Sequence, residues 1–359
     1  MSVIDFRTDF IARPTPAMID AMAKAAREQP GFGLREDPTV ARLEEKAAEL
    51  LGTEDALFCP TCTQANQIAI HLRCRPGESV LAEALSHIFL SESGAPAALS
   101  GALAVPVAGR HGVMQHRDVR QAIRAGDASR SRTALIVIEN THVFSGGRAV
   151  PLDAMRGIAD IAREHRVPVH IDGARLFNAA VALGCSARAL GACADSIAIS
   201  LNKGLAAPMG AILAGGRDFI RDAVRVRQMF GGGWRPANIL AAAGIVALDT
   251  MIDRLADDHR NARRLAEGLA GCRGVSIDVR EVETNIVMAE IDEAVMKTTD
   301  LVSRLEAQGI LVMPISVGAT NILRFVTHHD IGTPEIDRSV AACVEIMGRR
   351  PHRLHQDRS

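Results

Sequence analysis

The sequence contains no tyrosine, a single tryptophan and only 3% aromatic residues in total. A mechanism that depends on a tyrosine hydroxyl is therefore excluded. The chain also lacks any apolar run near the roughly 20 residues that a membrane-spanning helix requires. Its N-terminal stretch is interrupted by charged residues, unlike a secretion signal. We expect a cytoplasmic protein with no membrane partner.

An excess of charge of one sign is also missing. The 41 Lys and Arg residues are balanced by 42 Asp and Glu residues, which gives a formal net charge of -1. A neutral balance gives no reason to expect nucleic acid as a partner. The 359 residues are 48% hydrophobic, as in an ordinary globular protein with room for two domains.

Cysteines are few, odd in number and scattered. The seven residues do not form a disulfide framework and are interpreted as reduced core thiols. Cys59 and Cys62 make up a C-x-x-C motif, which would suit redox chemistry or half of a zinc site. Because no second such pair and no histidine pair at finger spacing accompanies it, we expect no metal. A redox role for the two thiols stays open as an alternative.

The hydrophobic pattern indicates two domains. Short apolar strands alternate with helices over residues 52–215, which predicts a mostly parallel, doubly wound α/β sheet. After a long helical region at 237–269, the pattern changes to that of a smaller α+β domain. The expected parts are an N-terminal arm at 1–38, a large domain at 39–245, a small domain at 246–348 and a disordered tail at 349–359.

Two predicted neighbouring strands end on residues that suit pyridoxal phosphate. The apolar run 167–171 ends on Asp172, and the run 196–200 is followed by Lys203. Parallel sheets bind ligands at this carboxyl edge. A lysine amine can form the Schiff base, and an aspartate can hold the pyridine nitrogen protonated. An exposed turn lysine and a helix-capping aspartate would explain the same residues.

The stretch 60–66 is rich in hydroxyl groups and precedes a predicted helix. Free backbone N–H groups and the helix dipole make such a turn a phosphate site. An ordinary N-cap by Thr61 or Thr63 is the alternative.

Short motifs follow one another in a fixed order along the chain. They are Asp5-Phe6-Arg7-Thr8-Asp9, Arg13-Pro14-Thr15, Glu36-Asp37-Pro38-Thr39-Val40, His87-Ile88-Phe89, Glu139-Asn140-Thr141-His142, Asp172-Gly173-Ala174-Arg175, Asn202-Lys203-Gly204-Leu205, Gly231-Gly232-Gly233 with Arg235, and Arg324-Phe325-Val326-Thr327-His328. Together they resemble the low-specificity threonine aldolases over roughly residues 4–346. The resemblance implies the fold type I architecture of pyridoxal-phosphate enzymes, with a mostly parallel seven-stranded sheet in the large domain and a smaller C-terminal α+β domain.

The resemblance also implies roles for individual residues. Lys203 would be the Schiff-base lysine, Asp172 would partner the pyridine nitrogen, and His87 would stack on the ring. The other implied cofactor contacts are Thr61, Cys62, Thr63 and Arg235 at the phosphate, with Arg235 from the same or a neighbouring subunit, and Arg175. The implied substrate contacts are Thr8, Arg175 and Arg324 at the carboxylate and His142 near the side chain.

The implied reaction is the cleavage, or formation, of a β-hydroxy-α-amino acid, which yields glycine and an aldehyde. A base must take the β-hydroxyl proton, and a neutral histidine suits this task near pH 7. His87 and His142 are both candidates at this stage. An amino-acid racemase, a β-eliminating lyase and a transaldolase on the same scaffold are the alternatives. The expected assembly is a homodimer or homotetramer with shared active sites.

Several positions depart from the family's pattern. Cys62 replaces a glycine in the phosphate turn, Leu34 and Arg35 replace a Tyr-Gly pair, and Ser91 replaces a tyrosine. If position 62 needed a positive φ, the cysteine would cost about 1 kcal/mol. Arg35 in the substrate pocket would favour a distal carboxylate or phosphate on the substrate. Otherwise Arg35 turns to solvent or pairs with Glu36.

Overall fold

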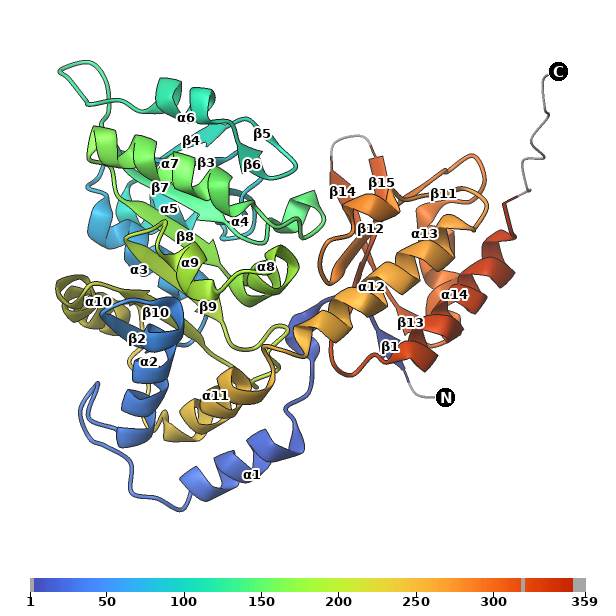
Figure 1. Ribbon diagram of the computed structural model, residues 1–359, viewed down its shortest axis with the longest axis horizontal. Helices are drawn as coiled ribbons and strands as arrows, with labels where there is room; N and C mark the ends of the chain where they lie inside the picture. The colour runs from blue at the N-terminus through green and yellow to red at the C-terminus, as the bar shows by residue number, and fades with distance from the viewer. Residues whose placement is uncertain (1–2, 318–319, 351–359) are drawn as a thin grey trace. The chain divides into compact units, whose positions relative to one another are not determined.

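The computed structural model describes residues 3–317 and 320–350 (Figure 1). The chain divides into two compact units. One comprises residues 10–256, and the other joins the residues up to Asp9 to those from Asp257 onward. None of the described helices has the length and apolar character needed to cross a membrane.

The larger unit is built on a seven-stranded sheet (Figure 1). The strands, in spatial order, are β2 (Asp55–Cys59), β10 (Ala211–Gly215), β9 (Ser196–Ser200), β8 (Val169–Gly173), β7 (Thr133–Glu139), β3 (Ser79–Glu83) and β4 (Leu103–Val107). Only β10 runs against its neighbours. The expected mostly parallel seven-stranded sheet is thereby confirmed. Every residue of β7 is buried, as a strand covered on both faces requires.

Helices cover both faces of this sheet. Alternate residues of β2 show the division, because Ala56 and Phe58 belong to one hydrophobic cluster while Leu57 and Cys59 belong to another. The helices α3 (Cys62–Arg73), α5 (Ala95–Ser100) and α10 (Arg217–Met229) pack together on the Leu57 side. The remaining helices of the unit are α1 (Pro16–Ala25), α2 (Pro38–Leu51), α4 (His87–Leu90), α6 (His116–Ala122), α7 (Leu152–His165), α8 (Leu176–Leu183), α9 (Ala187–Gly191) and α11 (Asn238–Thr250).

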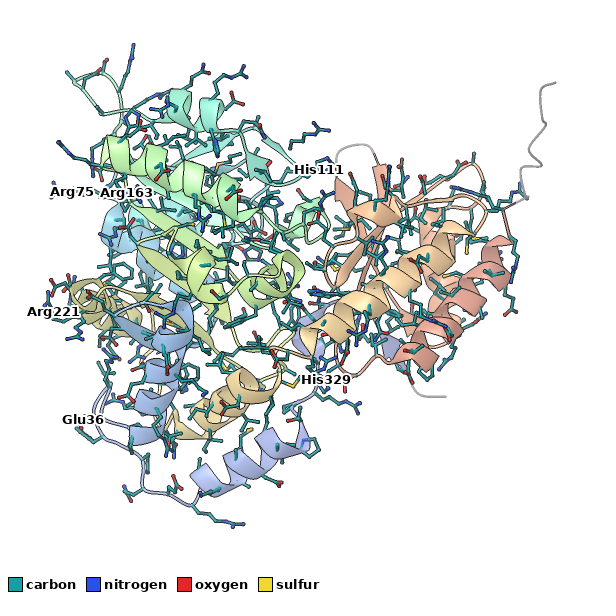
Figure 2. All side chains as sticks on the ribbon, viewed as in Figure 1. Glu36, Arg75, His111, Arg163, Arg221 and His329 are labelled. Atoms are coloured by element: carbon teal, nitrogen blue, oxygen red, sulfur yellow. The ribbon has the colours of Figure 1, made fainter. Side chains whose placement is uncertain are left out.

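Helix ends follow ordinary capping rules. The Asp37 side chain accepts hydrogen bonds from the first N–H groups of α2, Pro38 occupies its first position, and Gly52 ends it at φ 74°. Charged side chains on the outer helix faces point to solvent, as Arg163 and Arg221 do in Figure 2. Two short strands, β5 (Gly109–Arg110) and β6 (Val113–Met114), form a hairpin.

The smaller unit is an α+β structure. Its four-stranded antiparallel sheet has the order β11 (Val275–Ser276), β12 (Ile286–Ile291), β15 (Thr320–Val326) and β14 (Met313–Val317). The associated helices are α12 (Leu255–Ala270), α13 (Thr298–Ala307) and α14 (Thr333–Met347). Near the N-terminus, β1 (Ile4–Asp5) pairs in parallel with β13 (Ile310–Leu311), so the start of the chain belongs to this unit.

The structure divides the chain differently from the sequence expectation in two places. The predicted arm at 1–38 is split, because β1 joins the smaller unit while α1 packs against α11 in the larger one. At the other end, Arg349 pairs with Cys272 and Arg350 N–H donates to Gly271 O. The predicted disordered tail therefore has an ordered beginning, and residues 351–359 lie outside the described residues.

Candidate active site

The carboxyl edge of the parallel strands gathers several polar residues. Glu83 ends β3, Glu139 ends β7, Ser200 ends β9, and Asp172 is the fourth residue of β8. The register pairs Glu139 with Asp172 in neighbouring strands. Polar side chains that follow apolar strands are thus brought to one edge, where open α/β sheets bind their ligands.

Asp172 is held firmly through one of its two oxygens. Its Oδ2 accepts a hydrogen bond of 2.9 Å from Asn66 Nδ2. Its Oδ1 accepts a longer hydrogen bond of 3.3 Å from Ala174 N and lies 3.9 Å from Cys62 Sγ. A carboxylate oxygen with unused acceptor capacity is what a protonated ring nitrogen requires.

The helix α3 begins directly beside this carboxylate. Thr61 is its N-cap, and the Thr61 hydroxyl accepts from Gln64 N at 3.1 Å. Ala65 N donates to Thr61 O. Within the described part of the chain, the N–H groups of Cys62 and Thr63 have no recorded acceptor, so they can bind an anion together with the helix dipole. The N-cap and the phosphate cradle therefore coexist at this turn.

Cys62 fits the turn without backbone strain. It occupies the first position of α3 and is not among the residues with positive φ. Burial raises the pKa of its thiol well above the ordinary value; nearby Asp172 raises it further and Lys203 opposes the shift. Burial likewise raises the pKa of Cys59 to about 12. Because reactive cysteine pairs depend on a thiolate of lowered pKa, these neutral thiols do not support the redox alternative.

Lys203 lies in the loop that joins β9 to β10. The loop is closed at its base by Leu201 N–H donating to Gly210 O at 2.9 Å. A Cβ atom on Gly204 would lie 2.7 Å from Leu255 Cδ2, so a larger residue after the lysine would require the end of the Leu255 side chain to move. The charge of Lys203 influences the pKa of both Cys62 and His87, which places the three residues in one cluster.

His87 is hydrogen-bonded to Glu92, a carboxylate that the sequence patterns did not indicate. Its Nδ1 lies 2.9 Å from Oε1 of Glu92, whose side chain is fully buried. Its backbone N–H donates to Glu139 Oε2 at 2.7 Å. Burial lowers the pKa of His87, but the Glu92 hydrogen bond and the charge of Asp172 outweigh this and raise it overall. The His87 side chain is 30% exposed.

His142 is enclosed instead. Its side chain has no exposed surface, and its Nε2 lies 3.0 Å from Glu83 Oε2 and 3.9 Å from Glu139 Oε2. A Cβ atom on Gly112 would lie 2.5 Å from the His142 side chain, so the β5–β6 turn closes over the ring. Burial lowers the pKa of His142, yet Glu83 and Glu139 raise it overall.

The predicted carboxylate-binding residues are divided between the units. Arg175 is buried and follows β8 directly, three residues after Asp172. Thr8 and Arg324 belong to the smaller unit. There Arg324 Nη2 donates to Arg7 O at 2.9 Å, which brings the arginine next to the neighbour of Thr8.

Arg35 requires a correction. Its guanidinium donates to Glu44 Oε2 and to both oxygens of Asp55, with the shortest distance, 2.8 Å, to Asp55 Oδ1. Asp55 is the first residue of β2 and so lies at the edge opposite to Asp172. Glu36, labelled in Figure 2, accepts from Gly33 N instead. Arg35 therefore stabilises the large unit and does not belong to the candidate site of its own subunit.

The hydrogen bond of the Arg235 side chain is made to Phe32 and not to the phosphate turn at residues 61–63. Its Nη1 donates to Phe32 O at 2.9 Å, and its guanidinium lies 6.0 Å from the centre of the Phe32 ring. Its contact with a cofactor phosphate, in a neighbouring subunit, stays a prediction.

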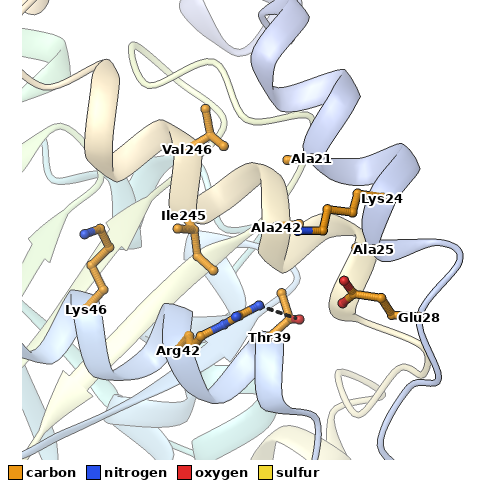
Figure 3. Close-up of a pocket in the computed structure, with 10 residues that line it drawn as sticks. All are labelled: Ala21, Lys24, Ala25, Glu28, Thr39, Arg42, Lys46, Ala242, Ile245 and Val246. Carbon is orange, nitrogen blue, oxygen red and sulfur yellow. Dashed lines mark hydrogen bonds between the residues drawn. The ribbon is translucent and has the colours of Figure 1, made fainter.

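A separate cavity of about 450 Å³ lies between α1, α2 and α11 (Figure 3). Lys24, Arg42 and Lys46 line it, with Arg42 donating to Thr39 Oγ1 and Lys46 paired with Asp249. It contains none of the residues predicted for the active site, so the carboxyl edge of the sheet remains the candidate site.

Comparison with solved structures defines the class of the fold. Threonine aldolase from Leishmania major superposes with a TM-score of 0.84 at 23% identity, covering 96% of this chain and 99% of that one. Serine palmitoyltransferase from Sphingomonas wittichii gives 0.77 at 17% identity, covering 96% and 88%. The fold is that of the pyridoxal-phosphate enzymes of fold type I, as expected from the sequence.

Sequence comparison gives the family. The model of the family described as beta-eliminating lyase matches residues 5–294. Low-specificity L-threonine aldolase 1 of Arabidopsis thaliana is 37% identical over 97% of each chain. The low specificity L-threonine aldolase of Escherichia coli strain K12 is 38% identical over 93% of this chain and 96% of its own. The chain belongs to the β-eliminating lyase family. This confirms the expected pyridoxal-phosphate-dependent lyase class.

Proposed function

We propose that this protein cleaves a β-hydroxy-α-amino acid to glycine and an aldehyde, or forms it from them, with pyridoxal phosphate attached to Lys203. The observation that supports this most is the cluster of Lys203, Asp172, His87 and the start of α3 at one sheet edge. Each of these groups has the chemistry that the cofactor needs from the protein. The bound cofactor would supply an electron sink for the carbanion left at Cα.

Three features of the chain would hold the cofactor. Lys203 Nζ would attach it covalently, and the N–H groups of Cys62 and Thr63 would bind its phosphate. Asp172 Oδ1 would hold a proton on the ring nitrogen, because Asn66 already fixes the other oxygen. His87 would lie against the ring.

We infer that His87 is the base that takes the β-hydroxyl proton. Because Glu92 is acceptor-only when ionised, His87 Nδ1 carries the hydrogen between them, and in the neutral ring Nε2 keeps a lone pair. The His87 side chain also has exposed surface, whereas His142 is enclosed and held on Glu83. In this assignment His142 helps to shape the site and does not take the proton.

The substrate carboxylate would be bound by Arg175, and the resemblance to the family implies the same role for Thr8 and Arg324. A guanidinium offers a carboxylate two parallel hydrogen bonds, which fixes the orientation of the Cα substituents. We also propose a cytoplasmic homodimer or homotetramer with shared sites. Phe32 is 87% exposed beside Arg235, and a partner subunit would cover this apolar ring.

Purified protein incubated with a panel of β-hydroxy-α-amino acids tests the proposal. We expect glycine and the matching aldehyde in equal amounts, with threonine and its allo isomer in the panel. Exchange of the α-proton of alanine or serine without release of aldehyde would instead indicate a racemase. Formation of a keto acid and ammonia from serine would indicate β-elimination.

A further inference from the structure

Asn66 lies in the first half of α3 and is almost fully buried. Its amide nitrogen donates to two carboxylates, to Asp172 Oδ2 at 2.9 Å and to Glu92 Oε1 at 3.0 Å. Its Oδ1 lies 3.0 Å from His170 Nε2. The orientation of the amide follows from its partners, because carboxylates only accept hydrogen bonds and so require the NH₂ group on their side.

His170 fixes the other side of this amide. Burial lowers the pKa of His170 to about 4, so its ring is neutral and carries one N–H. Asn66 Oδ1 can only accept, and therefore Nε2 carries the hydrogen. The remaining ring nitrogen, Nδ1, accepts from the hydroxyl of Ser196 at 2.9 Å. Donors and acceptors thus alternate from Ser196 through His170 to Asn66.

Glu92 carries the chain of hydrogen bonds onward to His87. Its Oε1 accepts from Asn66 and from His87 Nδ1, and its Oε2 accepts from Gln67 Nε2 at 2.6 Å. One ring nitrogen of His87 and one carboxylate oxygen each of Glu92 and Asp172 lie within 4.8 Å of one another. Two buried carboxylates this close repel each other unless a donor lies between them. The amide of Asn66 is that donor.

We propose that Asn66 and Glu92 are positioning residues that couple Asp172, which would hold the proton on the cofactor's ring nitrogen, to His87, which would stack on the ring. The inference rests on the proposed function, because both end groups act on the cofactor. By bonding to both carboxylates, Asn66 stabilises two negative charges in one buried site. It also fixes Asp172 through Oδ2, which would leave Oδ1 for the cofactor, while Glu92 fixes His87 through Nδ1, which would leave Nε2 available.

The coupling predicts that the electrostatic state of the bound cofactor depends on residues that do not touch it. The charged groups that act on His87 are Glu92, Asp172 and Lys203, and Glu139 binds its backbone N–H. Asn66→Ala removes the donor between the two carboxylates. Asn66→Asp adds a third carboxylate in its place. Both changes should weaken cofactor binding. They should also shift the pH midpoint, which is the pH at which half of the pH-dependent change in the absorbance of the bound cofactor has occurred.

The test uses apo protein reconstituted with pyridoxal phosphate and followed by absorbance. A lost hydrogen bond to a buried charge corresponds to about a 10- to 100-fold increase in the cofactor dissociation constant for Asn66→Ala. The pH midpoint of the absorbance should move by about one unit. Far-UV circular dichroism checks that each variant is folded. An unchanged dissociation constant together with an unchanged midpoint would overturn the proposal.

Two matched variants at His170 test the same hydrogen-bonded network if the Asn66 variants fail to fold. His170→Gln places an amide donor near the position of Nε2, and His170→Leu removes it at similar volume. We expect the Gln variant to stay within about threefold of wild type and the Leu variant to resemble Asn66→Ala. Equal behaviour of the two variants would overturn the proposal. Wild-type protein that takes up no cofactor would overturn the proposed function as well.

Discussion

Replacing Arg35 should destabilise the protein and leave its substrate preference unchanged. The guanidinium makes hydrogen bonds to Glu44, Asp55 and the carbonyl oxygen of Ala56. Glu44 is the important partner, because its side chain is only 3% exposed. The Arg35→Ala variant removes the cation that is hydrogen-bonded to this buried carboxylate, although the charge of Arg227 still acts on it.

The size of the effect follows from these contacts. Removing one partner of a buried ion pair costs about 3–5 kcal/mol. Two features reduce this figure here: the Arg35 side chain is 32% exposed, and Phe58 N–H still donates to Glu44 at 2.8 Å. We therefore expect a loss of about 2–3 kcal/mol in the free energy of unfolding at pH 7.

The loss should depend on pH in a defined direction. Burial raises the pKa of Glu44 above its ordinary value of 4.5, although Arg35 lowers it in the wild type. Without Arg35 the folded-state pKa rises further. A carboxyl group whose pKa is raised by folding destabilises the protein only above its unfolded value. The difference between variant and wild type should therefore shrink as the pH falls toward 4.5.

Urea unfolding of wild type, Arg35→Ala and Arg35→Lys at several pH values measures this. The lysine variant keeps the charge but not the planar fork, so it should lose an intermediate amount of stability. Unchanged stability of Arg35→Ala, combined with a new preference between threonine and an anionic β-hydroxy amino acid, would refute the reasoning and return Arg35 to the substrate pocket.

Other predictions concern the site itself. Lys203→Ala should fold normally but carry no covalently bound cofactor after borohydride reduction, as mass spectrometry would show. Cofactor that is still covalently bound to the variant would contradict Lys203 as the attachment point. Glu92→Gln removes a group that raises the pKa of His87, so the acid limb of kcat/KM should move to lower pH, and an unmoved limb would count against His87 as the base. Cys62→Gly should not raise thermal stability, because Cys62 has no positive φ for a glycine to relieve; a large gain in the midpoint temperature would reveal strain.

The sequence predicted the sheet well because its signals are local. The apolar runs that end on Asp172 and precede Lys203 are strands β8 and β9, and alternation with helices predicted the parallel order. The division of the chain was harder to predict. The pairing of β1 with β13 joins residues more than 300 positions apart, and no local pattern indicates such a contact.

The candidate site residues were also easier to predict where the signal is local than where it depends on distant contacts. Asp172 and Lys203 come at or after the ends of apolar strands, a position that suggested cofactor chemistry. The same position would also suit a helix cap and an exposed turn lysine, and only the ordered family motifs favoured the cofactor roles. The roles of Glu92 and Asn66 could not be predicted, since Glu92 lies in a turn and Asn66 within α3, and both roles depend on which residues lie across the sheet edge. Arg35 was misplaced for a related reason: the sequence indicates that a guanidinium is present but not which of the nearby acids faces it.

The reversed direction of β10 has a consequence for how the lysine is placed during folding. β9 and β10 are consecutive antiparallel neighbours, so the Lys203 loop is the connection of a local hairpin. Its closing contacts, Leu201 with Gly210 and Ala207 with Leu201, span few residues and form with little loss of chain entropy. We therefore expect the loop to form without the cofactor that the proposed function attaches to Lys203. Apo protein from which pyridoxal phosphate has been removed should bind it again without refolding.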